Sequence, residues 1–163
     1  MEYYDNDYLM HYGVKGMKWG VRKQQVSIGN GLTLKRNELG PIAKGLGKIN
    51  KNIAKEQNKM YDYTIMAGKR KVGNLSLYQE SVDSINVTWI GINRKERGKR
   101  YAQTVMDWTI KTAKKNGNKQ LTLEVPTNSP DARHIYEKQG FVAGKRISDD
   151  DVWGGLTEMK RKL

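Results

Sequence analysis

The chain has 163 residues and a formal net charge of +13, because thirty Lys and Arg outnumber seventeen Asp and Glu. It contains no cysteine, which excludes disulfide frameworks, thiolate metal sites and cysteine nucleophiles. Two histidines argue against a histidine-rich metal site, and no apolar run reaches the length of a membrane span. We therefore expect one soluble domain in an aqueous, cytoplasmic compartment, with no metal.

Excess positive charge attracts polyanions in general, including nucleic acid and small molecules that carry phosphates. No nucleic-acid recognition motif accompanies the charge. A nucleic-acid partner is thus suggested by charge alone, and a solvated lysine-rich surface explains the composition equally well.

Residues 1–23 differ in composition from the rest, since tyrosines, a tryptophan and basic residues alternate with glycines without a helical or strand period. We interpret them as a segment appended to a domain over residues 24–163. Within it, residues 11–22 resemble a short tract of structural and head proteins of tailed phages and prophages. That resemblance implies a phage origin, association with the virion and docking to a phage structural protein. A floppy tail, or one tucked against its own domain, is the alternative.

The hydrophobic pattern of the remaining chain predicts an α/β (α+β) domain, with helices on both sides of a mixed sheet. Alternating apolar residues indicate a first strand near residues 26–34. Apolar residues at helical spacing predict a single amphipathic helix over residues 41–60, with Pro41 in its first turn. An antiparallel meander of three short strands follows, with its turns at residues 69–71 and 82–84. These strands are centred on residues 61–65, 72–77 and 85–89.

Helices and strands alternate in the last third of the sequence. A helix is expected near residues 99–116, closed by Asn116 and Gly117, and a shorter one near residues 129–139. Strands are expected at residues 121–125, 141–147 and 152–159.

A basic turn that contains Gly98 lies between the third meander strand and the helix that follows. Such a turn exposes unpaired backbone N–H groups at a helix N-terminus, where the helix dipole is positive. Arg97, Lys99 and Arg100 add full positive charges. We predict a site for an anion here, and favour a pyrophosphate over a lone carboxylate.

This turn and the region after it resemble the GCN5-related N-acetyltransferase (GNAT) family. The turn matches the family's acetyl-CoA loop, Arg/Gln-x-x-Gly-x-Gly/Ala, from Arg97 to Ala102. One position departs from the pattern, because Arg100 stands where the family has its middle glycine; its side chain either narrows the approach to the phosphates or adds a charged contact. A second family pattern is matched by Asn128, Ala132, Tyr136, Glu137, Gly140 and Phe141.

The resemblance implies a single GNAT-like domain with a mostly antiparallel mixed sheet, in which two strands splay around acetyl-CoA. It also implies direct attack of a primary amine on the thioester, with Tyr136 as the acid that protonates the departing thiolate. Glu124 is the candidate base, and an outward-facing strand residue without a catalytic role is the equal alternative. The resemblance places acetyl-CoA contacts at Ile90, Gly91, Ile92, Arg97, Gly98, Lys99, Arg100, Tyr101, Ala102, Asn128 and Ala132.

The sequence therefore predicts an acetyl-CoA-dependent N-acetyltransferase. The alternative, favoured by Arg100 and by residues 11–22, is a GNAT-fold protein with weak or no activity that binds a phage particle. The acceptor stays open, because a peptide α-amine, lysine, polyamine, aminoglycoside and tRNA-linked amine all satisfy the pattern. We expect His134 on the surface and His11 outside the chemistry.

Overall fold

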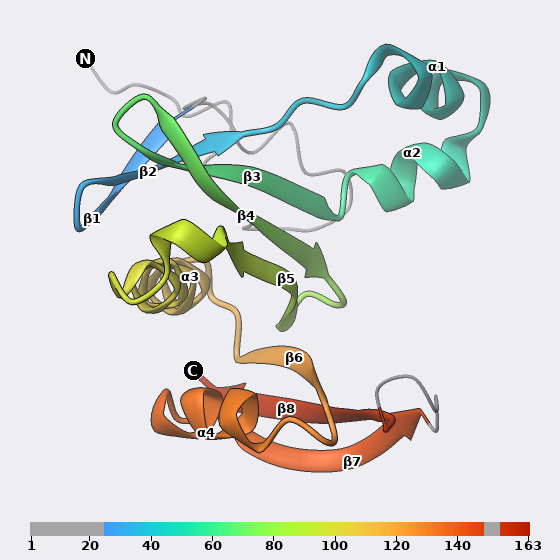
Figure 1. Ribbon diagram of the computed structural model, residues 1–163. Coiled ribbons are helices and arrows are strands. Elements are labelled where there is room, and N and C mark those ends of the chain that lie inside the picture. Colours follow the sequence, from blue (N-terminus) through green and yellow to red (C-terminus); the bar gives the residue numbers. More distant parts are fainter. Residues whose placement is uncertain (1–24, 149–153) are drawn as a thin grey trace.

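The computed structural model describes residues 25–148 and 154–163, which form one eight-stranded sheet with four α-helices (Figure 1). The strands follow the order β1-β2-β3-β4-β5-β6-β8-β7, and only the β5–β6 pair is parallel. The strands are β1 (Gln25–Gly29), β2 (Leu32–Arg36), β3 (Met60–Ala67), β4 (Arg70–Gln79), β5 (Ser84–Ile92), β6 (Gln120–Pro126), β7 (Val142–Ser148) and β8 (Leu156–Lys162). The helices are α1 (Pro41–Ile49), α2 (Lys51–Gln57), α3 (Tyr101–Lys115) and α4 (Pro130–Lys138).

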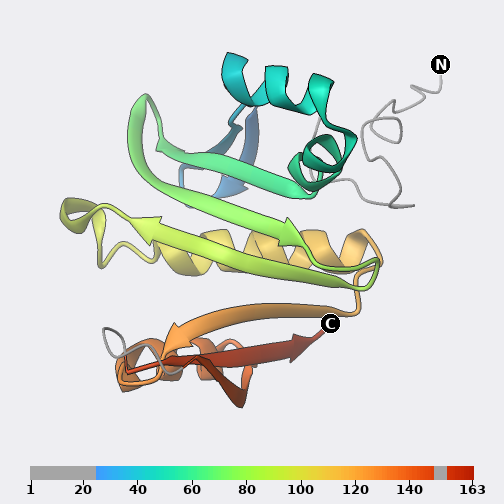
Figure 2. The same cartoon turned by 90° about the vertical axis from the view of Figure 1, so that its right-hand side faces the viewer.

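Helix α3 covers one face of the sheet, as its apolar periodicity predicts. Figure 2 shows it behind β4 and β5, with α1 and α2 on the other side of the sheet. Its buried residues Val105 and Met106 meet the alternate residues of the strands that also point to this face, and the ring of Trp108 lies edge-on to Tyr63, with 5.7 Å between centroids. The predicted mixed sheet with helices on both sides is confirmed.

The first predicted strand is wrong, because residues 26–34 form two strands rather than one. Asn30 and Gly31 both adopt positive φ angles, 51° and 69°, and so join β1 and β2 as a tight hairpin. An Asn-Gly pair at a two-residue turn is the usual signal of such a hairpin, and it was present in the sequence.

The single helix predicted for residues 41–60 is also wrong. The backbone of Asn50 is extended, and its side-chain Oδ1 accepts a hydrogen bond from Asn52 N–H at 2.9 Å, which starts a second helix. Helix α1 leaves its apolar residues in solvent, with Ile42 82 % and Ile49 85 % exposed. Met60, the last apolar residue of the predicted helix, instead opens β3.

The remaining boundaries shift by a few residues. Arg70 and Lys71 belong to β4, so the first turn of the meander lies at Gly68 and Lys69. Ser84 belongs to β5, and Gly117, with φ 82°, ends α3 as predicted. The start of the strand predicted at residues 152–159 lies outside the described residues, and its described part begins at Leu156.

Among the residues that the structure describes, no helix is both long and apolar enough to cross a membrane.

Candidate active site

Strands β5 and β6 stop pairing part-way along their length. Their parallel register runs from Ser84 opposite Gln120 to Val87 opposite Leu123, and both strands continue beyond it without pairing to each other. An irregularity in the β4–β5 register lies at the same level, where Ser76 pairs with Trp89 but Leu77 pairs with Val87. The extra residue bends β5 away from β6 and opens a gap in the middle of the sheet.

The backbone groups that face this gap follow from the pairing on either side. Asn93 N–H donates to Val72 O at 2.8 Å, so by the antiparallel alternation Gly91 points its polar groups to β4 and Ile90 points them to the gap. Thr127 N–H donates to Gly155 O at 2.9 Å, so Glu124 likewise points its backbone to the gap. Two unpaired strand edges thus face each other.

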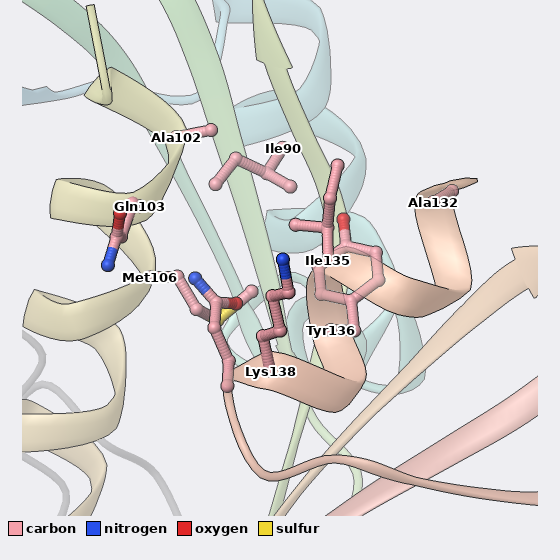
Figure 3. Close-up of a pocket in the computed structure, with 9 residues that line it drawn as sticks. Ile90, Ala102, Gln103, Met106, Ala132, Ile135, Tyr136 and Lys138 are labelled. Atoms are coloured by element: carbon pink, nitrogen blue, oxygen red, sulfur yellow. The ribbon is translucent and has the colours of Figure 1, made fainter.

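A cavity of about 370 Å³ opens on the helical side of the gap (Figure 3). Helices α3 and α4 form its walls, and Ile90 of β5 reaches into it. The lining is mainly apolar and includes Ile90, Ala102, Met106, Ala132, Ile135 and Tyr136. A narrow, largely apolar ligand arm with amide groups fits between such walls and the two free strand edges.

Tyr136 belongs to α4, and its ring packs edge-on against Phe141 with 5.9 Å between centroids. In Figure 3 its hydroxyl points towards the part of the cavity where Ile90 lies. Burial raises the pKa of the Tyr136 phenol, because the charged form loses hydration. The hydroxyl therefore keeps its proton at neutral pH and can give it to a stronger base.

The basic turn at the end of β5 begins with a 3₁₀ turn, Arg94–Glu96. Glu96 is buried and accepts from Lys99 at 2.7 Å and from Arg70 at 2.8 Å. The hydrogen bond from Lys99 and the charge of Arg70 hold the pKa of Glu96 below its ordinary value. Lys99 is thus paired with Glu96 in this structure, and its contact with the cofactor stays a prediction.

The rest of this turn is fixed by backbone contacts. Arg97 Nε donates to Ile92 O at 3.3 Å, and Asn30 Nδ2, from the β1–β2 hairpin, donates to Lys99 O at 3.0 Å. Gly98 adopts a positive φ of 81°. Within the described residues no side chain caps α3, so the N–H groups of its first turn remain available to an anion.

A second pocket, of about 410 Å³, lies on the opposite face of the sheet at the same gap. The alternation along β6 sends Leu123 and Val125 into the core and Glu124 to this pocket. Glu124 is thus an exposed strand residue that also lines a pocket, and its role as a base stays a prediction. Its neighbours in the lining include Asp62, Tyr78, Glu80, Thr88 and Trp89.

The sequence profile of the acetyltransferase (GNAT) family matches residues 45–141, more than half of the chain. The chain belongs to the GNAT family. Its members transfer acetyl groups from acetyl-CoA to amines, so this protein is an acetyl-CoA-dependent N-acetyltransferase. Residues 2–26 match a family of unknown function (DUF7211). No curated protein matches the sequence.

Solved GNAT structures share the fold at low identity. An Elizabethkingia anophelis family member with acetyl-CoA bound superposes with a TM-score of 0.62 at 17 % identity, covering 83 % of this chain and 100 % of that one. A chimera of the Vibrio cholerae spermidine N-acetyltransferase SpeG and hSSAT superposes with a TM-score of 0.62 at 19 % identity, covering 81 % of this chain and 95 % of that one. A Bacillus subtilis acetyltransferase in complex with CoA superposes with a TM-score of 0.59 at 15 % identity, covering 81 % of this chain and 97 % of that one.

Arg100 stands where the GNAT pattern has a glycine, and its backbone adopts a conformation that favours glycine. Arg100 has φ 58° and ψ 20°, the left-handed conformation that glycine adopts without a steric penalty. The loop therefore keeps the backbone path of a glycine, and the arginine side chain is exposed at its outer surface. For a non-glycine residue this conformation costs about 1–2 kcal/mol.

The other predicted site residues differ in whether they line the helical cavity. Ile90, Ala102, Ala132 and Tyr136 line the helical cavity together, and their cofactor contacts stay predictions. Asn128 is not among the residues that line this cavity; it lies in the β6–α4 connection and packs against Gly154, where an added Cβ would come within 3.2 Å of it. Gly91 packs under the Trp89 indole, and its backbone does not face the gap.

His134 is exposed on α4 and lies 4.0 Å from Glu137, outside both pockets. His11 lies outside the described residues. Within the described residues, no group of three or more His, Cys, Asp or Glu could hold a metal ion.

Sequence reasoning missed Asp62, Glu80 and Glu96. Glu96 carried a usable signal, since a single acid within a run of bases often pairs with them. Asp62 and Glu80 carried none, because they come from separate strands and only the sheet brings them to one pocket.

Proposed function

We propose that this enzyme holds acetyl-CoA from the helical side of the β5–β6 gap and admits a primary amine from the opposite side. The observation that carries the proposal is a pair of pockets, one on each face of the sheet, near the point where β5 and β6 no longer pair with each other. A thioester in the gap is then within reach of groups from both faces.

The chain offers groups that suit each part of acetyl-CoA. The positive-φ turn and the free N–H groups at the start of α3, with Arg97 and Arg100 beside them, suit a pyrophosphate. The apolar cavity and the Ile90 backbone suit an amide-containing arm, which can pair with a free strand edge. Acetyl-CoA supplies the activated acyl group.

Three groups of the chain assist the transfer in this proposal. Ile90 N–H donates to the thioester oxygen as negative charge grows there. Glu124, directly or through a water, takes the proton that the attacking amine loses when its nitrogen bonds the acetyl carbon. Tyr136 gives its proton to the sulfur as the C–S bond breaks, and solvent returns the proton to Tyr136.

A thiol-release assay with calorimetry tests this function. Because the chain has no cysteine, a thiol reagent detects only the CoA thiol that the reaction frees. We expect acetyl-CoA to bind by calorimetry and an amine to accelerate thiol release. Binding without amine-dependent release would instead support the inactive, particle-binding alternative, which the family match does not favour. Absence of binding would contradict the proposal.

We also propose that residues 1–23 are an appended docking segment and that residues 24–163 carry the chemistry. Support comes from the two family matches, which cover residues 2–26 and 45–141 without overlap. Deleting residues 1–23 should leave acetyl-CoA binding intact and abolish co-sedimentation with a phage particle, where the full chain co-sediments. Loss of acetyl-CoA binding would make the segment part of the enzyme, and unchanged sedimentation would make it a passive tail.

A further inference from the structure

We propose that the acceptor is a small linear aliphatic amine that carries more than one ammonium group, a diamine or polyamine. This inference rests on the proposed function, since it concerns the pocket from which the amine enters. It goes further by assigning the acceptor class, which the sequence left open among five kinds of amine.

The charge of the second pocket is opposite to that of the whole chain. Of ten residues that line it, three are carboxylates, Asp62, Glu80 and Glu124, and none is Lys or Arg. Lys59, whose ammonium lies 5.8 Å from the centre of the Tyr78 ring, is paired with Glu56 at 2.8 Å. Within the described residues, the carboxylates of Asp62 and Glu124 have neither an ion-pair nor a hydrogen-bond partner. On a +13 chain, this local excess of negative charge favours a cationic ligand.

Side-chain hydrogen bonds at the pocket form a chain in which each group donates towards Glu80. Thr122 Oγ1 donates to Glu80 Oε2 at 2.9 Å, Asn86 Nδ2 donates to Thr122 Oγ1 at 2.9 Å, and Thr88 Oγ1 donates to Asn86 Oδ1 at 3.0 Å. A carboxylate can only accept, so Glu80 fixes the direction of this chain of bonds.

Two of the hydroxyl groups that line the pocket already donate their protons elsewhere. Thr88 has given its proton to Asn86, and Tyr78 gives its own to Glu56 Oε2 at 2.8 Å. Both oxygens still offer lone pairs to the pocket. Because an ammonium group has three donors and no acceptor, it matches these carboxylate and hydroxyl oxygens, whereas a carboxylate ligand, which has acceptors only, does not.

The spacing of the carboxylates calls for two cationic centres. Asp62 of β3 pairs with Ser76 of β4, Ser76 pairs with Trp89 of β5, and Glu124 lies one strand further on β6. Three strand intervals separate Asp62 from Glu124, at least about 14 Å at the usual spacing, because the last interval crosses the open β5–β6 gap. One ammonium group cannot pair with both carboxylates, but the two ends of an extended diamine can.

The surface between these carboxylates suits a methylene chain. Trp89 is 60 % exposed, and its indole lies over Gly91, where an added Cβ would come within 2.7 Å of the indole nitrogen. Met60 adds a second exposed apolar side chain at the Asp62 end. A small polyamine also fits a +13 protein better than a basic peptide tail does, because it stays within the acidic pocket and meets none of the surrounding charge.

The test compares two amines of equal length, 1,7-diaminoheptane and heptylamine, in the thiol-release assay. For the wild-type protein we expect kcat/KM to be about tenfold higher for the diamine, the scale of a hydrogen bond between charged groups. Asp62→Asn should remove most of this advantage. Asp107→Asn, which removes an exposed carboxylate on α3 away from this pocket, should keep it.

Several results would overturn the inference. Equal kcat/KM for the two amines, equal losses for both in Asp62→Asn, or a clear preference for a peptide amine would each do so. If Asp62→Asn fails to fold, as judged by its melting curve, the wild-type protein is assayed at increasing NaCl concentration instead. Added NaCl must then reduce the kcat/KM advantage of the diamine, and an advantage that does not depend on salt overturns the inference. Acetyl-CoA binding by calorimetry separates the two proposals, since its absence removes the proposed function itself.

Discussion

The two pockets at the β5–β6 gap differ in every respect except size. The helical pocket, about 370 Å³, is mainly apolar and has a basic turn at its edge, whereas the opposite pocket, about 410 Å³, is lined by three carboxylates. An anionic and a cationic substrate can thus approach from opposite faces without meeting the unfavourable charge of the other site. In the proposed function, the sheet therefore separates two incompatible ligands, and the gap between its strands lets them react.

The largest expected effect tests the helical pocket. Tyr136→Phe should lower turnover about 10²–10⁴-fold, because only the hydroxyl can protonate the leaving sulfur. Acetyl-CoA affinity by calorimetry should stay within about twofold, since the ring and its contact with Phe141 remain. Wild-type turnover in this variant would leave Tyr136 as a packing residue.

The next effect tests the acidic pocket. Glu124→Gln should lower kcat/KM about 10²-fold at neutral pH and leave a rate that rises with pH as the free amine becomes more abundant. Glu158→Gln provides the control, because Glu158 is the register partner of Glu124 on β8 and is paired with Lys160. If the two variants lose activity alike, the loss reflects general charge and not a base at Glu124.

A smaller effect is expected at the basic turn. Arg97→Ala should weaken acetyl-CoA binding by about 1.5–3 kcal/mol, the scale of a charged hydrogen bond. Arg94→Ala, three residues earlier, should have much less effect. Calorimetry with a pantetheine fragment that lacks the phosphates gives the decisive comparison, because equal losses for both ligands would contradict a pyrophosphate contact.

The smallest effect concerns Arg100. Arg100→Gly removes a left-handed backbone cost of about 1–2 kcal/mol, while the freedom of glycine in the unfolded chain offsets about 0.5–1 kcal/mol. Net stabilisation of about 0.5–1 kcal/mol should appear in denaturant melts. Arg100→Ala, which keeps the strained conformation, should not show it. Weaker acetyl-CoA binding in both variants would identify a phosphate contact, and tighter binding in the glycine variant alone would identify a steric obstacle.

The sequence predicted the part of the fold that local patterns control. Helix α3, strand β6 and helix α4 were predicted to within a few residues, because each has a clear apolar period and a Gly or Pro at an end. The candidate cofactor side of the site could be proposed from the sequence for a different reason, since the Arg97–Ala102 loop and Tyr136 lie in two short contiguous motifs that resemble those of the GNAT family.

The errors share a different origin. Apolar spacing alone joined α1 to α2, but the Asn50 side chain caps a new helix, and the apolar face of α1 stays in solvent. The apolar spacing predicts a helix, but it does not predict which residues pack against the apolar face. The acidic pocket could not be predicted, because Asp62, Glu80 and Glu124 are far apart in sequence and depend on strand order and facing.

The directed chain of hydrogen bonds from Thr88 to Glu80 also bears on how specificity can evolve. Its direction is set by one carboxylate, that of Glu80, which directly follows β4. An amide at that position can donate as well as accept, so both directions of the chain become accessible and Thr88 can present a proton instead of a lone pair. Since glutamate and glutamine codons differ by one nucleotide, a single mutation outside the catalytic groups is enough to begin a change from cationic to neutral acceptors.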